Sequence, residues 1–119
     1  MKIVVVFFAL VLLFVSSAFA QNAGSAERGE AVFDLNCQPC HGTGPGDDGA
    51  PMLPGTHALY LKYEGEKPAL LQQRSDLTAD ALAVFIRNGI ASMPPFRKTE
   101  ITDQDISDIA AYIQSNVSE

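Results

Sequence analysis

One pentapeptide, Cys37-Gln38-Pro39-Cys40-His41, combines residue types and a spacing suited to redox chemistry. Two thiols three residues apart on a helical turn can bond to the two vinyl groups on one edge of a porphyrin. The next residue, His41, then lies under the ring, where an imidazole nitrogen can bind the iron. The pattern predicts one covalently bound haem c on Cys37 and Cys40, with His41 as an axial ligand.

A haem iron bound by one histidine has a second axial position, and residues 21–119 offer three candidates for it: Met52, His57 and Met93. We favour Met93, because it lies far from the motif in sequence and can approach from the opposite wall of the pocket. Two prolines directly follow Met93 and would stiffen its backbone, and a thioether ligand raises the reduction potential. Met52 is interpreted as flexible core filler. His57 is interpreted as a loop residue, although bis-histidine ligation would lower the potential.

The second ring nitrogen of a metal-bound histidine usually donates a hydrogen bond to a nearby acceptor. Pro51 is suited to accept from His41, because it has no N–H of its own and its carbonyl lies in the loop after the motif. With both axial positions filled, no substrate can reach the iron. We therefore expect an electron carrier rather than an enzyme.

The chain of 119 residues is long enough for one domain, and it begins with a pattern typical of export. Lys2 precedes an apolar run over residues 3–15, and residues 16–20 end in an A-x-A cleavage pattern. The run is shorter than the roughly 20 residues that a membrane-spanning helix needs. We expect a signal peptide over residues 1–20 and a cytochrome domain over residues 21–119, without stable membrane insertion, in the periplasm.

The charge balance restricts the kinds of partner. The formal net charge is −6, and loss of Lys2 with the leader makes it one unit more negative. An acidic surface argues against nucleic acid and anionic lipid and fits a protein partner with a basic patch. Export also places both cysteines in an oxidising compartment, where they are expected to be bonded rather than free.

Residue patterns predict an all-α fold of three to five short helices around the haem, with no strand and no repeat. Helices are expected over residues 26–36, 79–88 and 103–115, with shorter helical pieces over 57–62 and 68–74. Ser25, Thr78 and Thr102 are the expected N-caps, and Gly89 is the expected stop of the second long helix. The glycine-rich loop over residues 42–55 should wrap the haem edge, and residues 90–96 should be extended.

Apolar side chains at helical spacing indicate the core. They are Val32 and Phe33, then Leu82, Phe85 and Ile86, then Ile106, Ile109, Ala110 and Ile113. Gly29 lies one turn before Phe33 on the same face, and a glycine within a helix costs roughly 1 kcal/mol relative to alanine. From the residues alone it is either a point of close helix approach or a tolerated weak position.

Three other functions compete with electron transfer. A thiol–disulfide oxidoreductase would use Cys37 and Cys40, but it would need an alternating strand–helix pattern that is absent here. A gas-binding haem sensor would leave Met93 unbound. A structural zinc site is a poorer interpretation, because the cysteines and two histidines lack paired ligand spacing.

Several segments together resemble a class I cytochrome c over essentially the whole of residues 21–119. They are residues 37–41, the loop Ala50-Pro51-x-Leu53-x-Gly55, Met93-Pro94 and the closing helix. The resemblance implies that the first and last helices cross at right angles, with Gly29 and Phe33 against Ile109 and Tyr112. It therefore favours close approach at Gly29. It also implies the axial ligands His41 and Met93, and Pro51 as the residue facing His41.

A narrower resemblance concerns residues 55–56, 76–78 and 93–101. These are similar to the small cytochrome subunits of flavocytochrome dehydrogenases of the p-cresol methylhydroxylase and eugenol hydroxylase type. The resemblance implies a separate dehydrogenase as electron donor. As an electron carrier, the protein is expected to dock its partners around the exposed haem edge and residues 93–96, and to pass electrons to an oxidase or another cytochrome. Candidate contacts to the haem propionates are Arg74, Arg97, Tyr60 and Tyr63.

Overall fold

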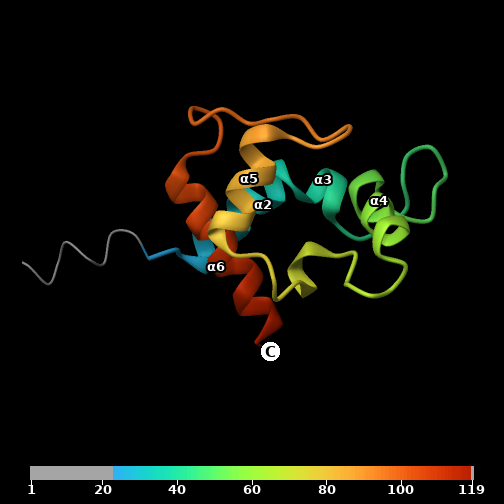
Figure 1. The fold of residues 1–119 in the computed structure, drawn as a ribbon, viewed down its shortest axis with the longest axis horizontal. Helices are drawn as coiled ribbons and strands as arrows, with labels where there is room; N and C mark the ends of the chain where they lie inside the picture. Colours follow the sequence, from blue (N-terminus) through green and yellow to red (C-terminus); the bar gives the residue numbers. More distant parts are fainter. Residues whose placement is uncertain (1–22, 119) are drawn as a thin grey trace, which may run out of the picture.

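The computed structural model describes residues 23–118, and within this range it is all-helical (Figure 1). The elements are α2 (Ala26–Asn36), α3 (Gln38–His41), α4 (Pro54–Tyr63), the 3-10 turn η2 (Leu71–Gln73), α5 (Ala79–Asn88) and α6 (Asp103–Val117). The described residues contain no strand, only an isolated bridge between Ile90 and Met93. The all-α prediction is confirmed. The predicted signal peptide lies outside the described residues.

Helix α2 begins and ends where its local sequence predicts. The Ser25 hydroxyl accepts a hydrogen bond from the Arg28 N–H at 3.3 Å, and Glu27 lies in the first turn. A side-chain cap satisfies one of the otherwise unpaired N–H groups of a helix N-terminus, and an acidic residue there favours the helix dipole.

Helices α2 and α6 cross and pack closely, which sets the frame of the domain (Figure 1). Gly29 is buried at the contact, and a β-carbon at this position would overlap the main-chain carbonyl of Asp108. One turn further on, the rings of Phe33 and Tyr112 pack in a tilted arrangement with centroids 5.4 Å apart. The predicted close approach at Gly29 is confirmed.

The core lies between α2, α5 and α6. Its buried members are Phe33, Leu77, Leu82, Ile86, Ile101, Ile106, Ile109, Ala110 and Ile113. The four apolar residues expected on the buried face of α6 are all among them. Phe85 differs from the expectation, because 39% of its surface is exposed.

The N-terminus of α6 is closed by a reciprocal cap. The Thr102 hydroxyl accepts from the Asp105 N–H at 3.1 Å, while the Asp105 carboxylate accepts from the Thr102 N–H at 2.8 Å. This capping box satisfies two donors at once. The helix continues to Val117, two residues beyond the predicted end.

The helix predicted over residues 68–74 is wrong. Only the 3-10 turn η2 forms there, with hydrogen bonds from the Gln73 and Arg74 N–H groups to carbonyls three residues back. The Arg74 side chain binds Asp76 at 2.6 and 2.7 Å, and the Arg74 backbone is extended. So short a helical segment is stabilised little by its own hydrogen bonds, and the extended Arg74 ends it.

Helix α4 is longer than the short piece predicted over residues 57–62. Pro54 occupies its first turn, where a missing N–H costs nothing, and the His57 N–H bonds to the Leu53 carbonyl at 2.8 Å. The loop predicted over residues 42–55 therefore ends earlier. The buried Thr56 hydroxyl donates to the Gly42 carbonyl at 2.9 Å and ties α4 back to the end of α3.

Helix α5 has the predicted bounds, with the Thr78 hydroxyl as its N-cap and Gly89 as its end. Residues 90–101, named the Met93 loop here, connect it to α6. The loop is not simply extended as predicted, because it starts with a tight turn in which Ile90 and Met93 exchange hydrogen bonds of 3.1 and 2.9 Å. Ala91 adopts a φ of 51° in this turn.

No helix among the described residues is long and apolar enough to cross a membrane.

Candidate functional site

The two cysteines and the histidine lie on one helical turn directly after α2. The Cys37 N–H bonds to the Phe33 carbonyl at 2.8 Å, so Cys37 ends α2, and its own carbonyl accepts from the Cys40 and His41 N–H groups at 3.1 and 2.8 Å. Neither cysteine forms a disulfide with another described residue, and Cys37 is half-buried while Cys40 is exposed. The arrangement gives the predicted three-residue thiol spacing, followed at once by the imidazole.

The environment of the thiols does not suit disulfide exchange. Burial, with a smaller contribution from neighbouring Cys40, raises the pKa of the Cys37 thiol to about 11. The attacking group in thiol–disulfide exchange is a thiolate, and its pKa is usually lowered in enzymes of that class. Cys37 is therefore suited to a permanent bond in an apolar setting and not to redox exchange of its own.

His41 has the properties of an imidazole ready to bind a metal. Burial lowers its pKa, which favours the neutral form that coordinates metals. Its Nδ1 atom is buried and has no hydrogen-bond partner. A buried polar atom without a partner is costly, so the ring fits a site in which another group completes its bonding.

Gly55 allows α4 to lie against the imidazole. A β-carbon at Gly55 would be 2.7 Å from His41 Cε1, 2.8 Å from Nδ1 and 2.8 Å from the Cys40 carbonyl oxygen. Any larger residue would push the ring or the helix away. This contact was not predicted from the sequence, where the only signal for it is a glycine directly after a proline.

The expected hydrogen bond between His41 and Pro51 is not formed in the structure, since His41 Nδ1 has no partner. Pro51 lies in an exposed bend three residues before α4. The backbone of Gly55, in the first turn of α4, approaches Nδ1 in its place. A role for Pro51 beside the histidine stays a prediction.

Met93 is half-buried and packs against the hydrophobic core. The preceding Gly89 has a φ of 67°, and a β-carbon there would lie 2.6 Å from the Met93 carbonyl oxygen and 2.9 Å from the Pro95 nitrogen. The Phe96 N–H bonds to the Ile86 carbonyl at 2.7 Å. The Met93 loop is therefore folded back tightly on the C-terminal end of α5.

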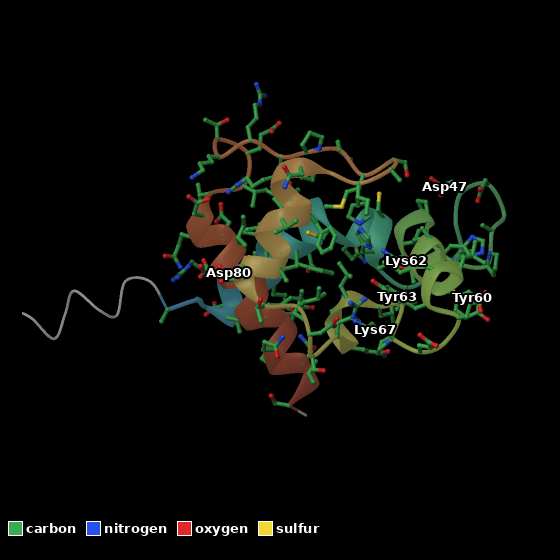
Figure 2. All side chains as sticks on the ribbon, in the orientation of Figure 1. Asp47, Tyr60, Lys62, Tyr63, Lys67 and Asp80 are labelled. Atoms are coloured by element: carbon green, nitrogen blue, oxygen red, sulfur yellow. The ribbon has the colours of Figure 1, made fainter. Side chains whose placement is uncertain are left out.

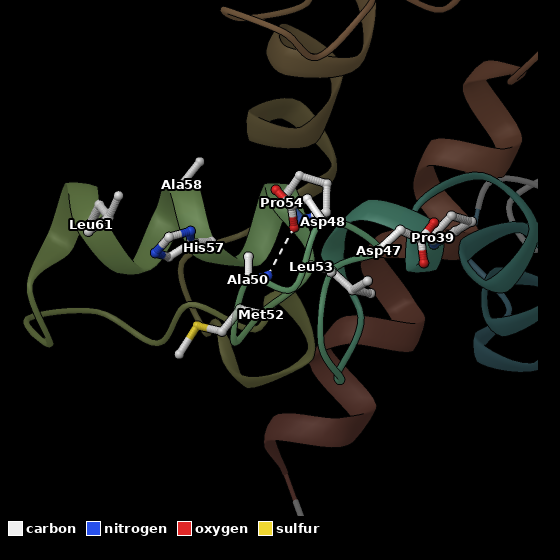
Figure 3. Close-up of a pocket in the computed structure, with 11 residues that line it drawn as sticks. Pro39, Asp47, Asp48, Ala50, Met52, Leu53, Pro54, His57, Ala58 and Leu61 are labelled. Carbon is white, nitrogen blue, oxygen red and sulfur yellow. Dashed lines mark hydrogen bonds between the residues drawn. The ribbon is translucent and has the colours of Figure 1, made fainter.

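The other two ligand candidates, Met52 and His57, line a groove of about 470 Å³ beside α4. Figure 3 shows that His57, Ala58 and Leu61 come from α4, while Met52 comes from the preceding loop. The interpretation of His57 as a loop residue is wrong, because α4 includes it. Met52 lines this groove and is not among the residues packed against the core, so the prediction of core filler is also wrong.

Two of the expected propionate contacts lie together, beside the chain after α4. The Arg74 guanidinium lies 4.9 Å from the centroid of the Tyr63 ring and is buried, and Lys67 lies on the same ring (Figure 2). Hydrogen bonds from Arg74 and Lys67 hold the pKa of Asp76 well below its usual value. Arg97 is instead 80% exposed and pairs with Glu100 inside the Met93 loop.

Comparison with known proteins defines the class. The profile of the family described as "Cytochrome C oxidase, cbb3-type, subunit III" matches residues 24–113. Cytochrome c6 of Gloeothece citriformis is 35% identical over 83% of this chain and 76% of its own length. Cytochrome c6 of Cyanidium caldarium is 28% identical over 95% of this chain and 90% of its own. The Azospirillum protein "Cbb3-type cytochrome c oxidase subunit CcoP" is 28% identical over 81% of this chain and 30% of its own length. No solved structure gives a match.

The all-helical fold and the matching profile together define a class I monohaem c-type cytochrome, and the chain belongs to this family. Its cofactor is one covalently attached haem c. Within the family, it is similar to the cytochromes c6 and to the oxidase subunit, and it is an electron carrier rather than an enzyme.

Proposed function

We propose that the protein is an exported, periplasmic electron carrier in which Cys37 and Cys40 hold the haem and His41 and Met93 bind its iron. The observation that carries the proposal is the position of half-buried His41, whose pKa is lowered by burial, on the same helical turn as the two thiols. Free thiols do not persist in an oxidising compartment, which supports their use in permanent bonds.

The haem, when bound, supplies an iron that takes up and releases one electron. The residues of this chain hold the two proposed iron ligands in place during electron transfer. The first turn of α4 lies against the His41 ring at Gly55, while the Met93 backbone is held by the turn at Ile90 and by the close packing at Gly89. A rigid ligand set changes little between the two oxidation states, which favours rapid electron transfer. Exposed Cys40 would place the adjacent edge of the haem at the surface for a partner.

Intact-mass measurement of the protein exported from a host that matures c-type haem tests the proposed attachment and export. We expect the mass of residues 21–119 plus one haem, retained under denaturing conditions. Replacing one cysteine, as in Cys40→Ala, should leave the haem attached by a single bond. The double variant Cys37→Ala/Cys40→Ala should release it to acidic organic solvent. A wild-type mass without haem would contradict the proposal.

For the donor, we propose a separate flavin-dependent dehydrogenase that oxidises phenols. Support comes from the similarity of residues 55–56, 76–78 and 93–101 to the cytochrome subunits of such dehydrogenases. The electrons would pass on to an oxidase or to another cytochrome in the respiratory chain.

Stopped-flow reduction of the ferric protein distinguishes the donor classes. A substrate-reduced phenol-oxidising flavoprotein of the p-cresol methylhydroxylase type is compared with a substrate-reduced quinoprotein alcohol dehydrogenase at equal concentration. A second-order rate constant at least about 10-fold larger with the flavoprotein supports the proposed donor. Specific, electrostatically complementary partners associate more than about 10-fold faster than proteins that meet without such complementarity. Equal rates, or faster reduction by the quinoprotein, would contradict the flavoprotein donor and leave the carrier function standing.

A further inference from the structure

Arg87, in the last turn of α5, holds the far half of the Met93 loop. Its guanidinium Nη1 donates to the carbonyl oxygens of Phe96 at 3.1 Å and Ile101 at 2.7 Å. Its Nη2 donates to the Asp103 carboxylate, in the first turn of α6, at 2.8 Å. One side chain therefore connects three points of the chain: the end of α5, the Met93 loop and the start of α6.

These three hydrogen bonds lie where they can restrict movement of the Met93 loop. The Arg87 side chain is only 20% exposed, and hydrogen bonds from a charged donor in a partly buried site are stronger than neutral, solvated ones. The loop has no helix or strand ladder of its own beyond the Ile90–Met93 turn. The carbonyls of Phe96 and Ile101 thus depend on Arg87 for a charged partner.

The two cations within the Met93 loop itself make no such bonds. Arg97 is 80% exposed and pairs with Glu100 three residues away, and Lys98 is 72% exposed and pairs with Asp103. Exposed ion pairs of this kind contribute little to stability. Neither side chain donates to a main-chain carbonyl of the loop.

We propose that Arg87 is a positioning residue for Met93, and that its three hydrogen bonds determine how firmly the Met93 thioether stays on the iron. This inference rests on the proposed ligation by Met93. Arg87 touches neither the iron nor the sulfur in this account. It acts by holding the carbonyls of Phe96 and Ile101, and so restricts the outward motion of the loop that would release the thioether.

The test uses the full-length, haem-loaded ferric protein and imidazole as a competing ligand for the methionine position. The variant Arg87→Met removes all three hydrogen bonds and keeps an unbranched side chain. The matched control Arg28→Met removes an ion pair of similar length, between Arg28 and Asp108 at 2.9 Å, at the contact between α2 and α6. Both variants are also measured for the free energy of unfolding.

We expect imidazole to bind Arg87→Met about 10-fold or more tightly than wild type, since charge-assisted hydrogen bonds to the loop are worth at least that factor. The sulfur-to-iron absorption band should also be weaker. Arg28→Met should match wild type within about twofold in both readouts even if it is less stable. Unchanged imidazole affinity in Arg87→Met, or an equal increase in Arg28→Met, would overturn the positioning role.

If Arg87→Met yields no folded haem protein, Arg87→Lys is measured instead. A lysine keeps the charge but lacks the planar fork that reaches three acceptors, so tighter imidazole binding than wild type supports the proposal and unchanged binding overturns it. Failure of the underlying ligation is recognised separately. If Met93 does not bind the iron, the wild-type protein and the Arg87 variants all lack the sulfur-to-iron band.

Discussion

At the scale of single residues, two side chains of different character define the proposed iron site. Burial lowers the pKa of half-buried His41, whose ring lies against Gly55, while Met93 is presented by a turn that folds back on α5. A histidine and a thioether together favour a high reduction potential and leave no open position for a substrate. The residue-scale prediction therefore concerns the sulfur ligand.

Replacing the proposed sulfur ligand should change the spectrum and the potential together. In Met93→His, we expect the sulfur-to-iron band to disappear. The reduction potential should fall by a fraction of the roughly 0.8 V range that axial ligands control. Spectroelectrochemical titration measures both quantities. Met52→Leu, which also removes a thioether but from the groove beside α4, should change neither, and loss of the band in that control would assign the ligand to Met52.

At the scale of elements, the contact between α2 and α6 depends on a missing side chain and a buried carboxylate. Gly29 brings the two backbones together. Asp108, buried on α6, accepts from the Ser25 N–H at 2.7 Å and from Arg28 at 2.9 and 3.1 Å. The two interactions anchor the start of α2, and the thiols and His41 follow directly from its end.

Adding one methyl group at the contact should separate the helices. Gly29→Ala places a β-carbon on the Asp108 carbonyl and 2.9 Å from the Ile109 nitrogen. Overpacking of this kind costs roughly 1–3 kcal/mol and sometimes more, despite the better helix propensity of alanine. Chemical denaturation of the haem protein measures it. Glu30→Ala, an exposed neighbour on α2, should stay within about 0.5 kcal/mol of wild type, and a neutral or stabilising Gly29→Ala would contradict the close contact.

The carboxylate of Asp108 should make this contact sensitive to acid. Burial opposes its ionisation, but hydrogen bonds from Arg28, Ser25 and Gln104 outweigh burial and hold the pKa of Asp108 below its ordinary value. Its stabilising contribution is therefore present above the unfolded-state pKa of about 3.9 and is lost as the pH falls through the lower folded-state pKa.

The measurement is the free energy of unfolding of wild type and Asp108→Asn as a function of pH. Wild type should be the more stable protein at pH 7, and the difference should shrink progressively below about pH 4. For Asp34→Asn, on the exposed side of α2, the free energy of unfolding should depend on pH in the same way as in wild type. A stability difference that is independent of pH would show that the Asp108 charge does not stabilise the fold.

The bounds of the helices were largely predictable from local sequence signals. The caps at Ser25, Thr78 and Thr102 gave the starts of the three long helices, because a side-chain cap is a property of adjacent residues. Over residues 68–74 only a 3-10 turn forms, because so short a segment gains little from helical hydrogen bonds alone. The start of α4 was missed because Pro54 and Gly55 together resemble a loop.

The residue types of the candidate site were predictable from the sequence, but the residues that position them were not. The spacing of Cys37, Cys40 and His41 carries a signal that needs no structure. Arg87 could not be identified, because two of its three acceptors are main-chain carbonyls, which any residue supplies. Likewise, Gly55 acts through proximity to His41, and such an approach depends on how α4 packs against α3.

At the scale of the whole molecule, the surface charge determines how partners approach. Among the described residues, every cation except Lys62 pairs with a carboxylate, whereas exposed acids such as Glu27, Glu30 and Glu66 are in none of these ion pairs. With a formal net charge of −6, the protein should attract cationic partners and repel anionic ones over a distance set by the salt concentration.

Small redox reagents of opposite charge test this directly. The rate of oxidation of the ferrous protein by the tris(phenanthroline)cobalt(III) cation should fall several-fold when ionic strength rises from about 0.01 M to about 0.1 M. The rate with the ferricyanide anion should rise over the same range, because screening weakens repulsion. Stopped-flow spectroscopy gives both rates, and the opposite pair of slopes would mean that the surface near the haem edge is effectively positive.

The most direct test of the central claim, a closed electron-transfer haem held by His41 and Met93, is the visible spectrum of the exported, haem-loaded protein in both oxidation states. We expect sharp low-spin bands in the ferrous form, a weak sulfur-to-iron band in the ferric form, and no rapid binding of carbon monoxide after reduction. A low-spin spectrum without the sulfur band would point to His57 as the second ligand. A high-spin spectrum with rapid carbon monoxide binding would mean an open iron and a gas-binding protein, and would contradict the account.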